Sequence, residues 1–241
     1  MHNRLDQTLI INASHCDHTG TLSLPACSEL FMDAATLHAE DIGVGMKAMM
    51  EKDLFWITAK VMVALQSRPQ MMESAELSTW PMRPERVRCD REYLIRQGDR
   101  IIARGKTEWA VLNMKTQRIV PPETIFPEGL QYTEPDVFPE LFSRFDRNFT
   151  EAEEIGTHRI VSTDLDLGGH MNHVAYIRAL FGCFSTEALD RQAFSFLEGH
   201  YASQSYEGET LHFVRKSDAD GSLLLAARND EGKNVFYAKL R

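Results

Sequence analysis

The sequence of 241 residues lacks the usual features of membrane, secreted and nucleic-acid-binding proteins. No apolar run approaches the roughly 18 residues that a membrane-spanning helix needs, and residues 1–11 hold no apolar stretch of signal-peptide length. The four cysteines stand apart without a CxxC pair, which is typical of free thiols in a reducing compartment. The net charge of −9 disfavours non-specific nucleic-acid binding. We therefore expect a cytoplasmic protein with no membrane span and no nucleic-acid partner.

Several common catalytic and cofactor motifs are also absent. The sequence contains no G-x-S-x-G elbow, no Walker loop and no dinucleotide fingerprint. The composition, 43% hydrophobic and 25% charged, is that of an ordinary globular protein and excludes wholesale disorder. At roughly 150 residues per domain, the length allows one large domain or two small ones.

The most informative feature that is present is an internal repeat. Cys16–Gly20 and Leu165–Gly169 each end in Asp-x-x-Gly and align without a gap at an offset of 149 residues. In each copy we expect a strand that ends at the Asp, followed by a long helix. Ser23 is the predicted N-cap of the first helix, and Pro25 fits its first turn. One face of the second helix is predicted by Val174, Ile177, Phe181 and Phe184.

Segments with strand-like patterns follow each helix. The predicted strands are 56–65, 75–80, 86–96 and 100–113 in the first half, and 194–203, 209–216, 222–229 and 234–240 in the second. Between the halves, residues 114–154 hold five of the nine prolines and six aromatic rings. This composition predicts a linker that lies on the surface and buries its rings. We therefore expect an N-terminal domain over residues 1–113, a linker over 114–154 and a C-terminal domain over 155–241.

The best candidate for a functional site is the second copy of the repeat. Asp166 directly precedes a two-glycine turn, and the unpaired N–H groups of a helix start can stabilise an oxyanion. Asp166 can act on water or attack a carbonyl, and His170 and Asn172 can orient a substrate. On the pattern alone, a helix N-terminus capped by Asp is an equally good interpretation. A metal site that adds Asp164 and His173 is disfavoured, because no further His or Cys cluster completes a ligand set.

These residues carry a resemblance to a known family. The pattern Asp166-x-x-Gly169-His170-x-Asn172 resembles the signature of hot-dog-fold thioesterases, and residues 164–176 resemble the acyl-acyl-carrier-protein thioesterases of plants and bacteria. The first half agrees with that family through Asp17-x-x-Gly20, Leu24-Pro25, Ala34-Ala35, Leu54-Phe55-Trp56 and Thr107-x-Trp109. The resemblance covers nearly the whole chain. It implies an α+β fold, a double hot dog of two tandem domains, each an antiparallel sheet wrapped around a long helix.

The resemblance also implies a function. The chain would hydrolyse the thioester of a fatty acid on acyl carrier protein, in fatty acid biosynthesis, with the acyl chain bound by the N-terminal domain and catalysis in the C-terminal one. Asp166 would be the general base or nucleophile, and the helix start after Gly169 would be the oxyanion site. The implied site residues are the catalytic Asp166, His170 and Gln204 and the substrate-binding Gly168, Gly169, Asn172 and Ser205. No metal or other cofactor is implied, and a homodimer stays open.

Two positions depart from the carrier-protein branch of the family. That branch usually has Asn where Gly168 stands, and Glu or Cys on a later strand, where this chain offers Gln204 and Ser205. Gln cannot be a general base, although it can hold a water or a carbonyl by hydrogen bonds. Many coenzyme A thioesterases with a hot-dog fold have Gly at the position of Gly168, so this residue favours a coenzyme A thioesterase as one alternative. Gln204 favours an acyl-binding protein without catalysis as another.

Two further groups of residues have two interpretations each. Arg83, Arg86, Arg88 and Arg91 form either a docking patch for an acidic carrier or, as we favour, a solvated strand face. Several methionines of the first half, among them Met49, Met62 and Met72, either line an adaptable acyl tunnel or fill gaps in the core.

Overall fold

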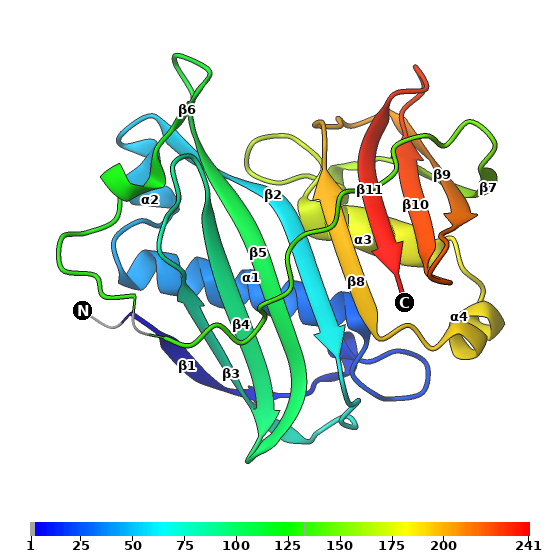
Figure 1. Ribbon diagram of the computed structural model, residues 1–241, viewed down its shortest axis with the longest axis horizontal. Helices are drawn as coiled ribbons and strands as arrows, with labels where there is room; N and C mark the ends of the chain where they lie inside the picture. Colours follow the sequence, from blue (N-terminus) through cyan, green and yellow to red (C-terminus); the bar gives the residue numbers. More distant parts are fainter. Residues whose placement is uncertain (1–2, 133) are drawn as a thin grey trace. The chain divides into compact units, whose positions relative to one another are not determined.

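The computed structural model describes residues 3–132 and 134–241, and the chain divides into two compact units, Met1–Glu140 and Leu141–Arg241 (Figure 1). The strands of the first unit are β1 (Leu5–Ile10), β2 (Leu54–Leu65), β3 (Ser74–Pro81), β4 (Cys89–Gln97), β5 (Arg100–Asn113) and β6 (Arg118–Val120). Its helices are α1 (Leu24–Asp41) and α2 (Met46–Met50), with 3-10 turns at Ala13–His15 and Pro122–Thr124. The strands pair antiparallel in the order β1-β3-β4-β5-β2, and β6 pairs with β5.

The second unit repeats this plan. Its strands are β7 (Glu153–Arg159), β8 (Phe196–Tyr201), β9 (Thr210–Ser217), β10 (Leu223–Arg228) and β11 (Asn234–Leu240), and its helices are α3 (His173–Gly182) and α4 (Thr186–Gln192). The antiparallel order β8-β11-β10-β9-β7 matches the order in the first unit strand for strand. In each unit a helix, α1 or α3, lies against one face of the sheet (Figure 1). This arrangement confirms the predicted α+β double hot dog.

Helix α1 forms as its sequence predicts. The Ser23 hydroxyl accepts a hydrogen bond from the Ala26 N–H, and Pro25 occupies the first turn, where no intrahelical donor is needed. The buried face of the helix packs on the sheet, where Phe31 stacks on Tyr93 of β4 with ring centroids 4.7 Å apart. Gly43 follows the helix with a φ of +76°, a conformation that glycine adopts without strain. The helix is therefore specified by its own caps and by its apolar face.

The second long helix is shorter than predicted, because α3 ends at Gly182 and Phe184 lies beyond it. Glycine lowers helix propensity at this point, and the Ser185 hydroxyl then accepts a hydrogen bond from Ala188 and begins α4. The packing of α3 depends on Tyr176, whose ring lies 5.4 Å from that of Phe236 on β11.

The Pro-rich segment, residues 114–154, is divided between the two units. It contributes buried side chains to both, including Leu130 and Phe138 in the first and Phe149 in the second. Phe149 packs with Tyr237 and with neighbouring apolar residues of β9 and β10. Two of the six aromatic rings of this segment, Phe138 and Phe149, thus lie in the core, and the other four are partly buried.

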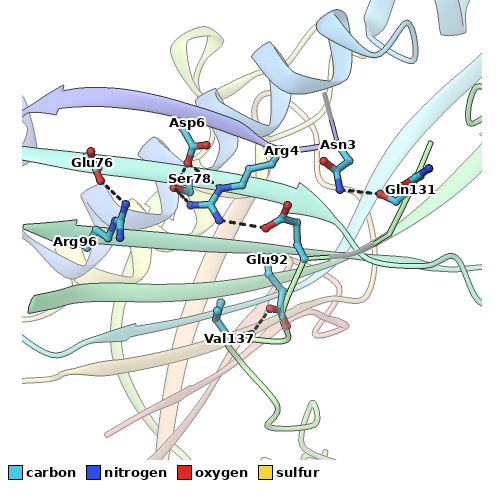
Figure 2. Close-up of polar contacts among 10 residues, drawn as sticks. Asn3, Arg4, Asp6, Glu76, Ser78, Glu92, Arg96, Gln131 and Val137 are labelled. Carbon is cyan, nitrogen blue, oxygen red and sulfur yellow. Dashed lines mark hydrogen bonds and ion pairs between the residues drawn. The ribbon is translucent and has the colours of Figure 1, made fainter. Parts of the chain in front are cut away.

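Polar contacts hold part of that segment against the face of the first sheet that points away from α1 (Figure 2). The Val137 N–H donates to Glu92 at 2.6 Å, and Arg4 bonds Glu134 at 3.1 Å. Glu92 is fully buried, and Lys106 lies 3.3 Å from its carboxylate. Burial raises the pKa of Glu92 to about 7, helped by the neighbouring Asp136 carboxylate. The segment is therefore bound to the sheet through Glu92, a buried carboxyl group that ionises at a higher pH than an exposed glutamate does.

Candidate functional site

The turn that holds Asp166 is closed by its own hydrogen bonds. The Asp166 N–H donates to the His170 carbonyl at 2.8 Å, and the Gly169 N–H donates to the Asp166 carbonyl at 3.0 Å. One carboxylate oxygen, Oδ1, accepts from the N–H groups of Gly168 at 2.7 Å and His170 at 3.3 Å. Gly169 has a φ of +73°, which favours glycine at this point. The turn thus fixes the Asp166 carboxylate from one side.

The surroundings of this turn differ from the prediction in two respects. Strand β7 ends at Arg159, and a 3-10 turn at Ser162–Asp164 comes before Asp166. Helix α3 begins at His173, not directly after Gly169, because Asn172 caps it by accepting from Val174 at 2.9 Å. The predicted oxyanion site at a helix start after Gly169 is therefore wrong in its geometry. The Gly168 and Gly169 N–H groups hold Asp166 instead.

A second segment, which follows β8, lies beside the turn. The Met171 N–H donates to the Ser205 carbonyl at 2.9 Å, so Gln204 and Tyr206 flank the point of contact. The Tyr206 ring meets the His170 ring edge to face at 5.2 Å, and its hydroxyl donates to Gln204 Oε1 at 3.3 Å. The structure thus brings His170 and Gln204 into one cluster, linked by Tyr206, and the His170 N–H also donates to Asp166.

Tyr206 was missed in the sequence. The available signal was its position two residues after Gln204, next to Ser205. Two predicted site residues have other surroundings than expected. The Ser205 side chain is fully buried, and Asn172 caps α3 through its side-chain oxygen.

Buried aromatic and imidazole rings lie behind the turn. Burial lowers the pKa of His173 to about 4, although the Asp166 charge opposes this effect. Burial also raises the pKa of the Tyr176 phenol to about 12. The Tyr201 hydroxyl donates to the His173 carbonyl at 2.9 Å, which ties β8 to the start of α3. At neutral pH the His173 and Tyr176 side chains near Asp166 are therefore uncharged.

The first copy of the repeat forms the same turn. The Asp17 N–H donates to the Thr21 carbonyl at 3.0 Å, and the Gly20 N–H donates to the Asp17 carbonyl at 3.0 Å. The Thr19 N–H donates to Asp17 Oδ1 at 2.9 Å, as the Gly168 N–H does to Asp166. Gly20 has a φ of +75°. The offset of 149 residues therefore relates two equivalent structures, as the repeat predicts.

The two turns differ in what reaches the second carboxylate oxygen. Arg68 donates to Asp17 Oδ2 at 2.8 Å and forms an ion pair with it. Burial raises the pKa of Asp17, but the Thr19 hydrogen bonds and the Arg68 charge outweigh it, and the net direction is downward. Among the residues that the structure describes, no side chain or N–H group donates to Asp166 Oδ2. Only the second turn therefore leaves one carboxylate oxygen for chemistry.

Gly168 lies where a side chain would disturb this site. A Cβ atom built on Gly168 would lie 2.9 Å from His170 Nδ1 and 3.1 Å from Asp166 Oδ1. Both distances are shorter than ordinary van der Waals contacts. The absence of a side chain at position 168 therefore lets the imidazole lie close to the carboxylate.

The structure does not assemble a metal site from the candidate ligands. Asp164 accepts from the Val161 N–H at 3.0 Å and bonds His158 at 2.8 Å, and His173 is buried. Over residues 3–132 and 134–241, no group of three or more His, Cys, Asp and Glu side chains is arranged to hold a metal ion. Within the same residues, no helix combines the length and the apolar character that crossing a membrane demands.

The four arginines of the first half do not form one exposed patch. Arg91 is buried and bonds His38 at 2.9 Å, and Arg88 is paired with Glu85 at 2.8 Å and Glu108 at 3.1 Å. Both interpretations, the docking patch and the solvated strand face, are therefore wrong for Arg91, while Arg88 is exposed and paired with two carboxylates. The methionines also divide, since Met49 and Met62 are buried while Met50, Met71 and Met72 are exposed.

Comparison with known proteins relates this chain to acyl-ACP thioesterases. A family model described as the acyl-ACP thioesterase N-terminal domain matches residues 2–127. The chain is 19% identical over 232 residues to the chloroplastic oleoyl-acyl carrier protein thioesterase 2 of Arabidopsis thaliana, covering 89% of this chain and 63% of that protein. It is 24% identical over 174 residues to the chloroplastic oleoyl-acyl carrier protein thioesterase of Coriandrum sativum, covering 65% and 47%. The chain thus spans between about half and two thirds of the length of these relatives.

Two solved structures share the fold over nearly their whole length. One is an acyl-ACP thioesterase from Bacteroides thetaiotaomicron, with a TM-score of 0.81, 20% identity and coverage of 99% of this chain and 97% of that one. The other is a 12:0-ACP thioesterase from Umbellularia californica, with a TM-score of 0.82, 18% identity and coverage of 100% and 97%. Their likeness agrees with the double hot dog described above.

Proposed function

Because the chain belongs to the acyl-ACP thioesterase family, we propose that it hydrolyses the thioester between a fatty acyl chain and acyl carrier protein. The product is a free fatty acid. The observation that carries this proposal is the open carboxylate of Asp166. The same turn occurs twice in the chain. Arg68 pairs with Asp17, whereas no donor among the described residues reaches Asp166 Oδ2. Of the two equivalent aspartates, Asp166 is therefore the one that is available as a base.

In the proposed reaction, Asp166 Oδ2 takes a proton from water while the water oxygen attacks the thioester carbonyl carbon. The tetrahedral intermediate then collapses, the C–S bond breaks, and the thiolate leaves with the electron pair. The proton held by Asp166 passes to the thiolate, which restores the carboxylate. A thiolate departs readily, so delivery of oxygen to the carbonyl is the demanding step. The Gly168 and His170 N–H groups hold Oδ1 and thereby fix the direction of Oδ2, which favours this step.

The neighbouring side chains have supporting roles in this proposal. His170, held by the Tyr206 ring, orients the substrate, and Gln204 holds the water or the carbonyl by hydrogen bonds. Asn172 and Ser205 support the turn, since the Asn172 side chain caps α3 and the Ser205 carbonyl accepts from the Met171 N–H. The Leu167 N–H, which has no acceptor among the described residues, is a donor left for a substrate oxygen. The second unit would thus perform the chemistry, and the first would bind the acyl chain.

We also retain a cytoplasmic location as part of the proposal. All four cysteines are free, and burial raises the pKa of Cys27 and of Cys89 to about 12. Thiols of this kind are typical of proteins in a reducing compartment.

The experiment that tests the function compares one acyl group on acyl carrier protein and on coenzyme A, followed by a panel of carrier thioesters of increasing chain length. We expect faster release of acid from the carrier thioester. Faster turnover of the coenzyme A thioester would favour the alternative that Gly168 suggests. Tight acyl binding without hydrolysis of either thioester would favour a binding protein and refute the proposal.

Two variants locate the chemistry. Asp166→Asn keeps the oxygen that accepts from Gly168 but removes the base, so kcat/KM should fall by roughly 10²- to 10⁴-fold, the usual range for a general base. Asp17→Asn is the matched control, because it makes the same change in the equivalent turn of the first unit. Its kcat/KM should stay near the wild-type value. Near-normal turnover by Asp166→Asn would show that Asp166 is not the base.

A further inference from the structure

The loops that follow β2 and β8 are equivalent in the two units. The Pro69 carbonyl accepts from the Leu22 N–H at 2.9 Å, and the Ser205 carbonyl accepts from the Met171 N–H at 2.9 Å. Leu22 and Met171 are 149 residues apart, the offset of the repeat, whereas Pro69 and Ser205 are 136 apart. A shorter connection in the second half therefore brings the same loop to the same turn.

A second pair of hydrogen bonds gives the same alignment. The Ile11 N–H donates to the Glu73 carbonyl at 3.0 Å, and the Ile160 N–H donates to the Glu209 carbonyl at 2.9 Å. The donors are again 149 residues apart and the acceptors 136. Position 68 in the first loop therefore corresponds to position 204 in the second.

The first of these positions carries the cation that closes Asp17. Arg68 Nη1 lies 2.8 Å from Asp17 Oδ2, and the Thr19 N–H and hydroxyl occupy Oδ1. Both carboxylate oxygens of Asp17 are thus bound, and its charge is paired. An aspartate in this state is a weaker base, because both of its oxygens have protein donors and a cation stabilises its charged form.

The second position carries Gln204, which has no charge. Its Oε1 accepts from the Tyr206 hydroxyl, and the Asp166 carboxylate accepts at Oδ1 from backbone N–H groups alone. A neutral amide cannot form an ion pair, and the side chain of glutamine is also shorter than that of arginine. Asp166, the equivalent aspartate, therefore keeps its Oδ2 atom without an ion-pair partner among the described residues.

We propose that the residue at this loop position decides whether the aspartate of the turn is closed or open, and that the neutral Gln204 is what keeps Asp166 available. The role in turnover rests on the proposed thioesterase function. Gln204 is in this view a positioning residue. It acts by leaving Asp166 without a cation, in addition to any hydrogen bond that it makes to substrate.

The test is to give the second unit the first unit's residue by the substitution Gln204→Arg. The crystal structure of this variant should place the introduced guanidinium within hydrogen-bond distance of Asp166 Oδ2, as Arg68 lies against Asp17. Turnover of the acyl-carrier thioester should fall by roughly 10²-fold. Added salt should restore part of it, because salt screens a partly exposed ion pair. The acid limb of the pH profile should move to lower pH, because the cation favours the carboxylate form.

Two further variants separate charge from bulk. Gln204→Met keeps the length of the side chain without charge, and its loss should be less than about 10-fold and insensitive to salt. Arg68→Gln opens the first turn and should leave turnover unchanged, since Arg68 is no part of the proposed machinery. Near-normal turnover by Gln204→Arg, or equal losses for Arg and Met at all salt concentrations, would overturn the proposal. An inactive wild-type protein would instead refute the thioesterase function, and the crystal structure of Gln204→Arg would still decide whether the ion pair forms.

Discussion

Replacing the buried Glu92 by Gln should remove a pH dependence from the stability of the first unit. The folded protein raises the pKa of Glu92 from 4.5 to about 7, chiefly because the carboxylate is buried (Figure 2). The folded state therefore binds a proton more tightly than the unfolded state does. The stabilisation from this group is complete below pH 4.5 and is lost as the pH rises to about 7.

The size of the effect follows from the two pKa values. At about 1.4 kcal/mol for each pH unit, the rise corresponds to a stability change on the order of 3 kcal/mol across the window. The variant Glu92→Gln keeps an oxygen that can accept the hydrogen bond from Val137, but its side chain does not ionise. The altered contact with Lys106 adds a cost that does not change with pH. The unfolding free energy of the wild type should therefore fall, relative to that of the variant, by about this amount as the pH rises.

The assay is urea unfolding of both proteins at several pH values across the window, with hydrogen exchange of the Val137 amide as a local measure. Glu128→Gln is the control, because Glu128 is exposed and lies in the same segment. We expect the control to follow the wild-type curve. Parallel curves for Glu92→Gln and wild type would show that Glu92 does not take up a proton in this window, and the reasoning would be refuted.

Two further substitutions test close packing at glycine positions. Gly168→Ala would place a Cβ atom 2.9 Å from His170 Nδ1, so the imidazole must move, and kcat/KM should fall by roughly 10- to 10²-fold with little change in the unfolding midpoint; unchanged kinetics would show that the position of His170 is unimportant. Gly105→Ala would place a Cβ atom 2.3 Å from the Phe31 ring, so urea unfolding should show a loss of about 1–3 kcal/mol. An equally stable Gly105→Ala variant would mean that Phe31 relaxes without cost.

Much of the fold was predictable because it depends on short-range patterns. The alternation of apolar residues predicted β5 at its observed bounds, and the cap at Ser23 predicted the start of α1. The end of α3 was not predicted, since the apolar face continues to Phe184 although the helix ends at Gly182. Periodicity shows which side chains share a face, but it does not reveal where a cap such as Ser185 starts a new helix.

The sequence by itself determined that two Asp-x-x-Gly turns exist, 149 residues apart, and that Asp166 and His170 lie in one of them. A turn of this kind forms from hydrogen bonds between near neighbours, so a short motif is enough to specify it. Only the tertiary structure decided which aspartate is open. Arg68 reaches Asp17 across 51 residues of chain, and Gln204 occupies the equivalent place in the second unit. Such a contact depends on how a strand returns the following loop to the turn, which no local pattern records.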